Sequence, residues 1–369
     1  MDLFRNQELE TIERQGGELR VAGCRIVLPR VYGFCGGVRN ALRKLQSTLD
    51  RTGDRTVWLL GEIIHNDTVN ARLRQRGVRI LPEDELERIF TCREPGDTIV
   101  IPAFGIPRGI QNRLRAECAE ACTLVDTTCG CVQRIWAFVE DMAAAGRTIV
   151  IHGKPHHPET LATLSRAQGP HNCVLLVPDK AAAERLADAL RRGTPEHYPA
   201  AWIKGACRTP SPHLALVNQT TMLCSETVQI ENLLQAAVAE SGGDLLLSNS
   251  ICRATEQRQR AAEKLCRAGC DTIVVVGGFT SSNTNSLYRL ASRYAPAYFV
   301  RDADDLQATR IQHYVPEKDR VERTRDWLPT PPCTVGVLAG ASCPPSVIGA
   351  VVLRLGTLIR NRAEPQEQA

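Results

Sequence analysis

The stretch YGFCGGVRNALRKL, residues 32–45, places Cys35 where a turn enters a helix, and the chain repeats this arrangement twice. The second copy, VDTTCGCVQRIWAFVEDM, contains Cys129, and the third, SNSICRATEQRQRAAEKL, contains Cys252. Self-similarity at a regular spacing is the signature of repeated structural units. We therefore expect three related modules, each opened by a cysteine at the head of a helix.

A polar motif follows each of these cysteines at nearly the same distance. The spacing is 30 residues to His65 in EIIHN, 28 to His157 in GKPHHPET and 29 to Ser281 in GGFTSSNTN. Each module then has a second apolar strand followed by a loop, namely VIPAFGIP, ALVNQTT and VGVLAGAS. We expect each module to offer one thiolate and a set of polar groups, and the three sets to converge on one centre.

Apolar runs such as RTIVIHG, CVLLVPD and DTIVVVGG alternate with stretches of helical spacing such as PETLATLSRA and KAAAERLADALRR. This alternation is typical of α/β folds with parallel sheets. The predicted division is an N-terminal lead-in and strand at 1–34 (helical over 1–24), three α/β modules at 35–127, 128–250 and 251–369, a surface insertion at 191–213, a long final helix and a disordered tail at 363–369.

The polar motifs lie directly after predicted strands. HGKPHH follows RTIVI, TSSN comes shortly after DTIVVV, QTT follows LALV, and GAS follows VGVL. In parallel α/β sheets, ligands bind at the carboxyl ends of the strands. This placement predicts that the motifs line a binding site.

The composition is that of an ordinary globular chain, with 43% hydrophobic and 23% charged residues in 369 and a net charge of +4. The arginines are spread among acids rather than gathered in a basic stripe, which argues against nucleic acid as a partner. The sequence has no apolar run of about eighteen residues, and its start lacks the apolar core of a secretory signal. We expect no membrane span and a cytoplasmic location.

Fifteen cysteines in such a chain favour metal or redox chemistry together with ordinary buried thiols. Because a helix amino terminus favours the thiolate that a metal needs, Cys35, Cys129 and Cys252 are predicted metal ligands. Three unrelated buried cysteines, or a zinc-stabilised structural protein, are the alternatives, although no C-x-x-C pair occurs. The cysteines expected to act as small buried hydrophobes are Cys24, Cys173, Cys207, Cys224, Cys266, Cys270 and Cys333.

Three thiolates would leave one iron of a 4Fe–4S cluster without a protein ligand. Clusters that only carry electrons usually have four. An open iron can bind substrate oxygen as a Lewis acid and can also deliver electrons. The number of cysteines therefore predicts a catalytic cluster.

Hydroxyl and amide side chains gather where strands end. Ser281, Ser282 and Asn283 stand at a helix start, where free backbone N–H groups favour an anion. A plain helix N-cap would explain one of these serines equally well. We predict a phosphate or diphosphate cradle, to which similar donors at other strand ends contribute: Gln219, Thr220, Thr221 and Ser342.

His65 and His157 occupy matching positions in modules 1 and 2, and each can donate to an anion or shuttle a proton. Glu159 lies two residues beyond His157, and as a carboxylic acid beside an iron-bound substrate it is a candidate proton donor. The alternatives are structural histidines and a first-turn acid that stabilises its helix. His152 and His156 flank the same loop as candidate supporting groups.

These motifs resemble the LytB/IspH family of 4-hydroxy-3-methylbut-2-enyl diphosphate reductases, and the resemblance runs from about Gly33 to Leu355. A single motif would be weak evidence, but here eight occur in the family's order. PAFG, HGK, VNQTTM and SSNTN look closest to the plant and cyanobacterial branch. The eight motifs are GFCGGV, EIIHNDTVNARL, VDTTC, HGKPHHPET, VNQTTM, ICRATEQRQ, VVGGFTSSNTN and GVLAGAS.

The resemblance implies three α/β modules in a pseudo-threefold arrangement around a central 4Fe–4S cluster held by the three cysteines named above. It implies reductive loss of an allylic hydroxyl, with two electrons from ferredoxin or flavodoxin and two protons, to give isopentenyl and dimethylallyl diphosphate. Thr220 and Glu159 would stand close to the substrate hydroxyl, with Glu159 relaying protons. The residues implied around the diphosphate are His65, His157, Thr221, Ser281, Ser282, Asn283 and Ser342.

The chain departs from the family pattern at three places. Phe104 stands where many bacterial members have histidine, and Gly130–Cys131 stand where proline usually follows the second cysteine. After GAS, the family's small residue, Pro and Asp are replaced by Cys343, Pro344 and Pro345. These departures keep two alternatives open: a diverged paralogue that reduces another hydroxylated diphosphate, and a non-catalytic iron–sulfur sensor.

Overall fold

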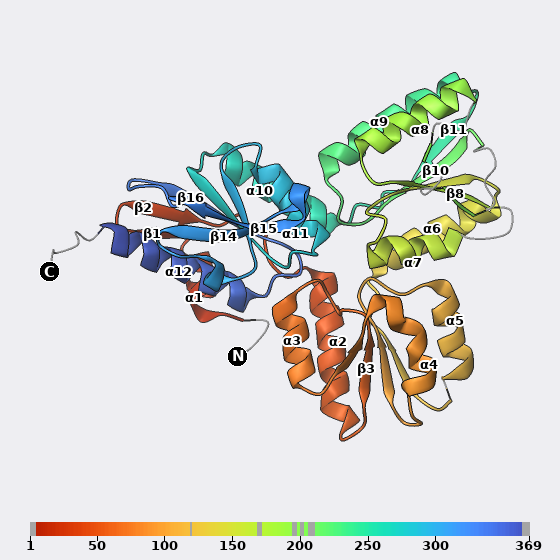
Figure 1. Cartoon of the computed structure of the whole chain (residues 1–369), viewed down its shortest axis with the longest axis horizontal. Helices are drawn as coiled ribbons and strands as arrows, with labels where there is room; N and C mark the ends of the chain where they lie inside the picture. The colour runs from red at the N-terminus through yellow and green to blue at the C-terminus, as the bar shows by residue number, and fades with distance from the viewer. Residues whose placement is uncertain are drawn as a thin grey trace. The chain divides into compact units, whose positions relative to one another are not determined.

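In the computed structural model, the described residues form three β-sheets, and the chain divides into two compact units (Figure 1). Unit 1 comprises residues 1–39, 65–71 and 253–369, and unit 2 comprises 40–64 and 72–252. The predicted α/β class is confirmed. The structure describes residues 5–118, 120–167, 172–193, 198–199, 203–205 and 211–363. Most of the predicted insertion at 191–213 and nearly all of the tail lie outside the described residues.

Unit 1 is built on a seven-stranded sheet with the order β1-β2-β16-β12-β13-β14-β15. Helices α1 and α12 pack on one face around a core that includes Ile26, Val335 and Ile348, and Figure 1 shows α10 and α11 on the other face. The elements are α1 (Gln7–Arg14), β1 (Glu18–Val21), β2 (Cys24–Val27), α10 (Arg253–Arg267), β12 (Thr272–Val276), α11 (Ser282–Ala291), β13 (Ala297–Val300), β14 (Arg310–Val315), β15 (Arg320–Arg325), β16 (Thr334–Ala339) and α12 (Pro345–Ala363).

The N-terminal segment is only partly helical, so the predicted helix over 1–24 is wrong beyond Arg14. Gly16 and Gly17 both have positive φ, +88° and +80°, which ends α1, since glycine adopts this conformation without steric cost. A tight turn at Ala22 and Gly23 then folds β1 back on β2 as an antiparallel pair. This hairpin supplies the edge of the seven-stranded sheet.

The first sheet of unit 2 is parallel, with the order β4-β3-β5-β6. Helices α4 and α5 bury Ile89 and Leu114 against Leu60, Ile99 and neighbouring residues. The elements of this part of the chain are α2 (Gly36–Thr52), β3 (Val57–Leu60), α3 (Asp67–Gln75), β4 (Arg79–Leu81), α4 (Ile89–Cys92), β5 (Thr98–Ile101), α5 (Arg108–Glu117) and β6 (Thr123–Asp126).

The second sheet of unit 2 has the order β11-β10-β7-β8-β9, and only β9 is antiparallel to its neighbour. Helices α8 and α9 cover one face and α6 and α7 the other, as Figure 1 shows. The elements are α6 (Gly130–Ala144), β7 (Thr148–His152), α7 (Pro158–Ala167), β8 (Cys173–Val177), α8 (Lys180–Arg192), β9 (Ile203–Gly205), β10 (His213–Asn218), α9 (Cys224–Glu240) and β11 (Asp244–Leu247).

Two of the cysteines expected to be plain thiols are joined to each other. Cys24 on β2 and Cys333, one residue before β16, form a disulfide across 309 positions of sequence. Cys173 is also disulfide-bonded. Cys207 lies outside the described residues. Of the helices that the structure describes, none is long and apolar enough to cross a membrane.

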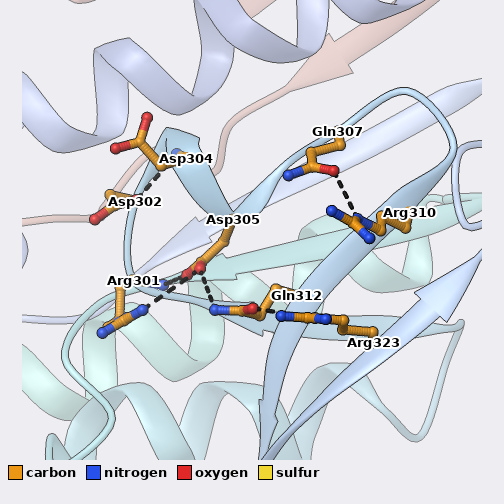
Figure 2. A pocket seen from close by; sticks show the side chains of 8 residues that line it. All are labelled: Arg301, Asp302, Asp304, Asp305, Gln307, Arg310, Gln312 and Arg323. Atoms are coloured by element: carbon orange, nitrogen blue, oxygen red, sulfur yellow. Dashed lines mark hydrogen bonds and ion pairs between the residues drawn. The ribbon is translucent and has the colours of Figure 1, made fainter.

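Unit 1 has a polar hollow of about 290 Å³ beside β13 and β14, where charged groups bind one another (Figure 2). The buried Asp305 carboxylate accepts the Arg301 backbone N–H at 2.9 Å and lies 3.7 Å from the Arg301 guanidinium. Gln312 donates to Asp305 at 3.3 Å and accepts from Arg323 at 3.4 Å. Three arginines face three aspartates here, so the charge is balanced internally and no ligand class is singled out.

Candidate functional site

Each of the three predicted ligand cysteines makes the same kind of backbone hydrogen bond. Each stands directly before a helix and donates its N–H to a carbonyl two residues beyond the end of a strand. The sequence pattern placed these loops near strand ends, but it did not show that they hold the cysteines. The pairs are Cys35 with Ala341 after β16 at 3.2 Å, Cys129 with Ala103 after β5 at 3.0 Å, and Cys252 with Thr220 after β10 at 3.2 Å.

The chemistry of these thiols fits a cluster. None of the three is in a disulfide, all are partly exposed, and the Val38 backbone N–H donates to the Cys35 sulfur at 3.4 Å. Cys35 belongs to unit 1, while Cys129 and Cys252 belong to unit 2. Among the described residues, no group of three or more His, Cys, Asp and Glu is placed to hold a metal ion within this structure.

Glu159 and Thr220 form a buried pair in unit 2. The Glu159 carboxylate, 2% exposed, accepts the Thr220 backbone N–H at 2.6 Å and the Thr220 hydroxyl at 2.8 Å. Glu159 stands in the first turn of α7, and Thr220 follows β10. Since the Thr220 carbonyl also receives the Cys252 N–H, a single loop residue contacts both the carboxylate and a predicted ligand segment.

Gln219 closes the same loop. Its side-chain oxygen accepts from the Lys154 N–H at 3.0 Å and the Thr160 hydroxyl at 3.3 Å, and its amide nitrogen donates to the Thr221 hydroxyl at 2.9 Å. A side chain at Gly153 would come within 2.7 Å of Thr160 and 3.0 Å of Gln219, so this approach requires glycine. Gln219 therefore organises the loop from inside the protein.

His157 is oriented by its own helix start. Its Nδ1 accepts the Glu159 backbone N–H at 3.2 Å, so a neutral imidazole here carries its proton on Nε2 and can donate from that atom. The ring of Phe104 meets the imidazole edge-on, with centroids 5.4 Å apart. Phe104, a departure from many bacterial relatives, therefore contributes an apolar wall beside His157.

In unit 1, three hydroxyls link α11 to the His65 loop. Ser281 caps α11 by accepting from the Thr284 N–H, and it also contacts the Thr284 hydroxyl at 2.9 Å. Ser342 lies 3.2 Å from the Ser281 oxygen and 3.1 Å from the His65 carbonyl oxygen. Because a side chain at Gly278 would come within 2.6 Å of that carbonyl, the two loops pack directly against each other.

Ser282 and Asn283 differ in their hydrogen bonding. The Asn283 side-chain oxygen accepts the Ala341 N–H at 2.8 Å, beside the carbonyl that receives the Cys35 N–H. The Ser282 hydroxyl is buried at 2% exposure and has no hydrogen-bond partner among the described residues. Buried hydroxyls are usually paired with protein or water, so the Ser282 hydroxyl is open to a water or a ligand.

Sequence reasoning missed several groups near these loops. The Thr128 and Ser346 hydroxyls are also buried without a partner in the described part of the chain. Asn218 and Ser250 form a buried hydrogen-bonded pair. The available signals were proximity alone: Thr128 precedes Cys129, Ser250 lies two residues before Cys252, and Asn218 precedes Gln219.

The two remaining departures leave the helices intact. Gly130 begins α6, and a side chain there would meet no atom within 4 Å. Cys131 accepts a hydrogen bond from Arg134 at 3.2 Å. Pro345 is the first residue of α12, a position that tolerates proline because its N–H would have no helical partner. Cys343 is fully buried, and burial raises the pKa of its thiol, which makes it inert.

Comparison with known proteins confirms the resemblance in the motifs. The LytB protein family model matches residues 26–356. The 4-hydroxy-3-methylbut-2-enyl diphosphate reductase of a Synechococcus strain is 32% identical over 97% of this chain and 92% of its own length. The reductase of the same name from Gloeobacter violaceus is 34% identical over 95% of this chain and 87% of its own. Both relatives are cyanobacterial, as the motifs indicated.

Two solved structures share the fold. The E-1-hydroxy-2-methyl-but-2-enyl-4-diphosphate reductase of Plasmodium falciparum aligns over 91% of this chain and 89% of its own, with a TM-score of 0.69 and 23% identity. An (E)-4-hydroxy-3-methyl-but-2-enyl diphosphate reductase, described as the terminal enzyme of the non-mevalonate pathway, aligns over 90% of this chain and 99% of its own. Its TM-score is 0.56 and its identity 25%.

Proposed function

This chain belongs to the LytB family of oxidoreductases, and from that premise we propose that it reduces 4-hydroxy-3-methylbut-2-enyl diphosphate. The allylic C–O bond breaks and oxygen leaves as water. Two electrons and two protons enter, and the products are isopentenyl and dimethylallyl diphosphate. Ferredoxin or flavodoxin is the proposed electron donor.

The residues proposed to bind the diphosphate are the polar groups at the strand ends. Ser282 supports this assignment most directly, because its buried hydroxyl has no partner in the described chain. The His157 Nε2–H is a second donor, since Nδ1 is engaged by Glu159. The remaining proposed contacts are His65, Thr221, Ser281, Asn283 and Ser342, with Gln219 shaping the loop.

Glu159 and Thr220 are the proposed proton-handling pair. Both carboxylate oxygens of Glu159 face Thr220 donors at 2.6 and 2.8 Å. When the carboxyl is protonated on Oε2, that O–H can donate back to the Thr220 hydroxyl, so the pair can hold a proton and pass it on. Burial excludes bulk water, which keeps this transfer between two positioned groups.

Cys35, Cys129 and Cys252 are the proposed ligands of a 4Fe–4S cluster with one iron free of protein ligands. The cluster would supply the electrons and a Lewis acid for the hydroxyl. The chain's own contribution is to fix the three cysteine backbones on strand-end loops, by the hydrogen bonds at 3.0–3.2 Å described above.

The Glu159–Thr220 pair carries the proposal, and anaerobic preparation of the protein tests it. We expect about four irons and four sulfides per chain, with turnover of the diphosphate to both products. Cys129→Ser should lose iron, while Cys131→Ser, two residues on in the first turn of α6, should keep it. Glu159→Gln should keep the iron and lose about a hundredfold or more in kcat.

The outcomes separate the alternatives. A full cluster without turnover of this diphosphate points to the paralogue. A full cluster whose iron sites do not change when the diphosphate is added points to the sensor. Zinc or no metal after anaerobic work contradicts the three-cysteine assignment. Near-normal turnover in Glu159→Gln removes that residue from the mechanism.

A further inference from the structure

The segments after β10 and β11 stay side by side beyond the sheet. Within the sheet, Leu216 pairs with Leu247 in parallel register, and the Ser248 N–H still donates to the Leu216 carbonyl at 3.1 Å. Further along, the Cys252 N–H donates to the Thr220 carbonyl at 3.2 Å. The path from the sheet to Cys252 therefore runs along the loop that contacts Glu159.

These two hydrogen bonds are the first and last of three rungs, that is, links between the two segments, and Ser250 supplies the middle one. Its hydroxyl accepts the Asn218 backbone N–H at 2.6 Å and the Asn218 amide at 3.1 Å, and it lies 3.1 Å from the Ser248 carbonyl, to which it donates. A hydroxyl has one hydrogen and two lone pairs, so this set uses its full capacity. Ser250 is 4% exposed, and water does not replace it freely.

Asn218 is fixed from its other side by His152. These residues end the parallel strands β10 and β7 and stand opposite each other in the register. The His152 Nδ1 lies 2.8 Å from the Asn218 side-chain oxygen, which only accepts, so His152 donates from Nδ1. The Asn218 amide nitrogen then faces Ser250, and the orientation of the whole side chain is determined.

We propose that Ser250, through Asn218 and His152, is a positioning residue that sets the Thr220 loop against both Glu159 and the Cys252 segment. Asn218 and Ser250 each stand two residues before a group of the proposed site, Thr220 and Cys252. The three rungs join the two segments at every second residue. A shift at the middle rung therefore moves the Thr220 N–H and hydroxyl relative to the Glu159 carboxylate.

The first test is amide hydrogen exchange in the metal-free protein, which needs neither cluster nor substrate. Ser250→Ala should speed exchange of the Asn218, Thr220 and Cys252 amides by about tenfold. Ser250→Thr keeps the hydroxyl and should restore slow exchange. Faster exchange at Asn218 alone, with Thr220 and Cys252 unchanged, would show a purely local role and overturn the proposal.

Ser165→Ala is the matched control. The Ser165 hydroxyl also accepts a backbone N–H, from Arg108 at 2.9 Å, and donates to a backbone carbonyl, of Ala162 at 2.6 Å. It lies on α7 with Glu159 but outside the proposed site. Its loss should lower the melting midpoint comparably and leave the Thr220 and Cys252 amides slow. Equal exchange changes in both variants would reduce the effect to general destabilisation.

The catalytic consequence rests on the proposed function and is measured separately. Ser250→Ala should lower kcat about tenfold to a hundredfold with KM within about twofold, because a small misplacement of a reacting group costs rate rather than affinity. Ser165→Ala should keep kcat within about twofold. If the unsubstituted protein turns over the diphosphate and Ser250→Ala has the same kcat, the positioning role is overturned. A parent without turnover contradicts the proposed function, and the exchange result still decides the positioning.

Discussion

The Thr220 hydroxyl lies 2.8 Å from the Glu159 carboxylate, although the two residues are 61 positions apart in the chain. The Thr220 backbone N–H reaches the other carboxylate oxygen at 2.6 Å, and the Thr220 carbonyl receives the Cys252 N–H. One residue thus connects the proposed proton donor to a predicted ligand segment through all three of its polar groups.

Thr220→Val tests the hydroxyl alone, because valine keeps the shape and the backbone N–H. We expect kcat to fall about tenfold to a hundredfold with little change in KM, since the carboxyl loses its proton-exchange partner. Steady-state kinetics of the anaerobic enzyme measure this. Thr220→Ser retains the hydroxyl and should stay close to the parent; a loss equal to that of valine would mean that the methyl group matters instead.

Ser281 and Ser282 are adjacent but should fail in different ways. Ser281→Ala removes the N-cap of α11 and should cost about 1 kcal/mol of stability, read from denaturant unfolding. Ser282→Ala removes a buried hydroxyl with no partner in the described chain, so stability should hold while KM for the diphosphate rises about tenfold. An unchanged KM in Ser282→Ala would take that hydroxyl out of the cradle.

Gly105, in the loop that holds Cys129, and Gly109, in the helix that follows this loop, give a second matched pair. Gly105 has φ +76°, and a side chain there would lie 2.2 Å from the Trp136 ring, so Gly105→Ala should cost about 2–4 kcal/mol. Gly109 is in α5 with no atom within 4 Å, so Gly109→Ala should stabilise by about 0.5–1 kcal/mol. The measurement is the change in unfolding free energy of each variant relative to the unsubstituted protein. Changes of the same sign in the two variants would contradict this account.

Sequence patterns predicted what depends on local order. The cysteines at helix starts and strands such as β7, β10 and β12 follow from short-range signals, and all occur where expected. The β14–β15 hairpin was missed because the segment RIQHYVPEKDRVERTR is dense in charge, while its register depends on pairing between strands. The Cys24–Cys333 disulfide spans 309 positions and has no local signal.

The site shows the same division. Sequence identified Glu159 and Thr220 as candidates but not that they contact each other, because that contact depends on the parallel packing of β7 and β10. Ser250 gave no signal beyond its place two residues before Cys252: its role arises only where two segments leave neighbouring strands together. Residues that bind can be recognised from motifs, whereas residues that position them depend on the fold.

Glu231 should make stability depend on pH in a direction opposite to most surface acids. Burial raises the pKa of this carboxyl, and the hydrogen bond from Asn218 at 3.5 Å opposes the shift only partly. A folded pKa above the unfolded value means that its favourable contribution is present at acidic pH and is lost as pH rises through the folded pKa. Glu231→Gln, which can still accept from Asn218, should therefore raise the melting midpoint at pH 7, and the gain should vanish near pH 4.

Glu263 is the control, because its hydrogen bonds from Arg267 and Tyr294 lower its pKa. Glu263→Gln should lower the midpoint at pH 7, and that loss should shrink as the pH falls through the folded pKa. Parallel melting curves of both variants between about pH 4 and 8 measure this, and shifts of the same sign at pH 7 would show that desolvation does not govern Glu231.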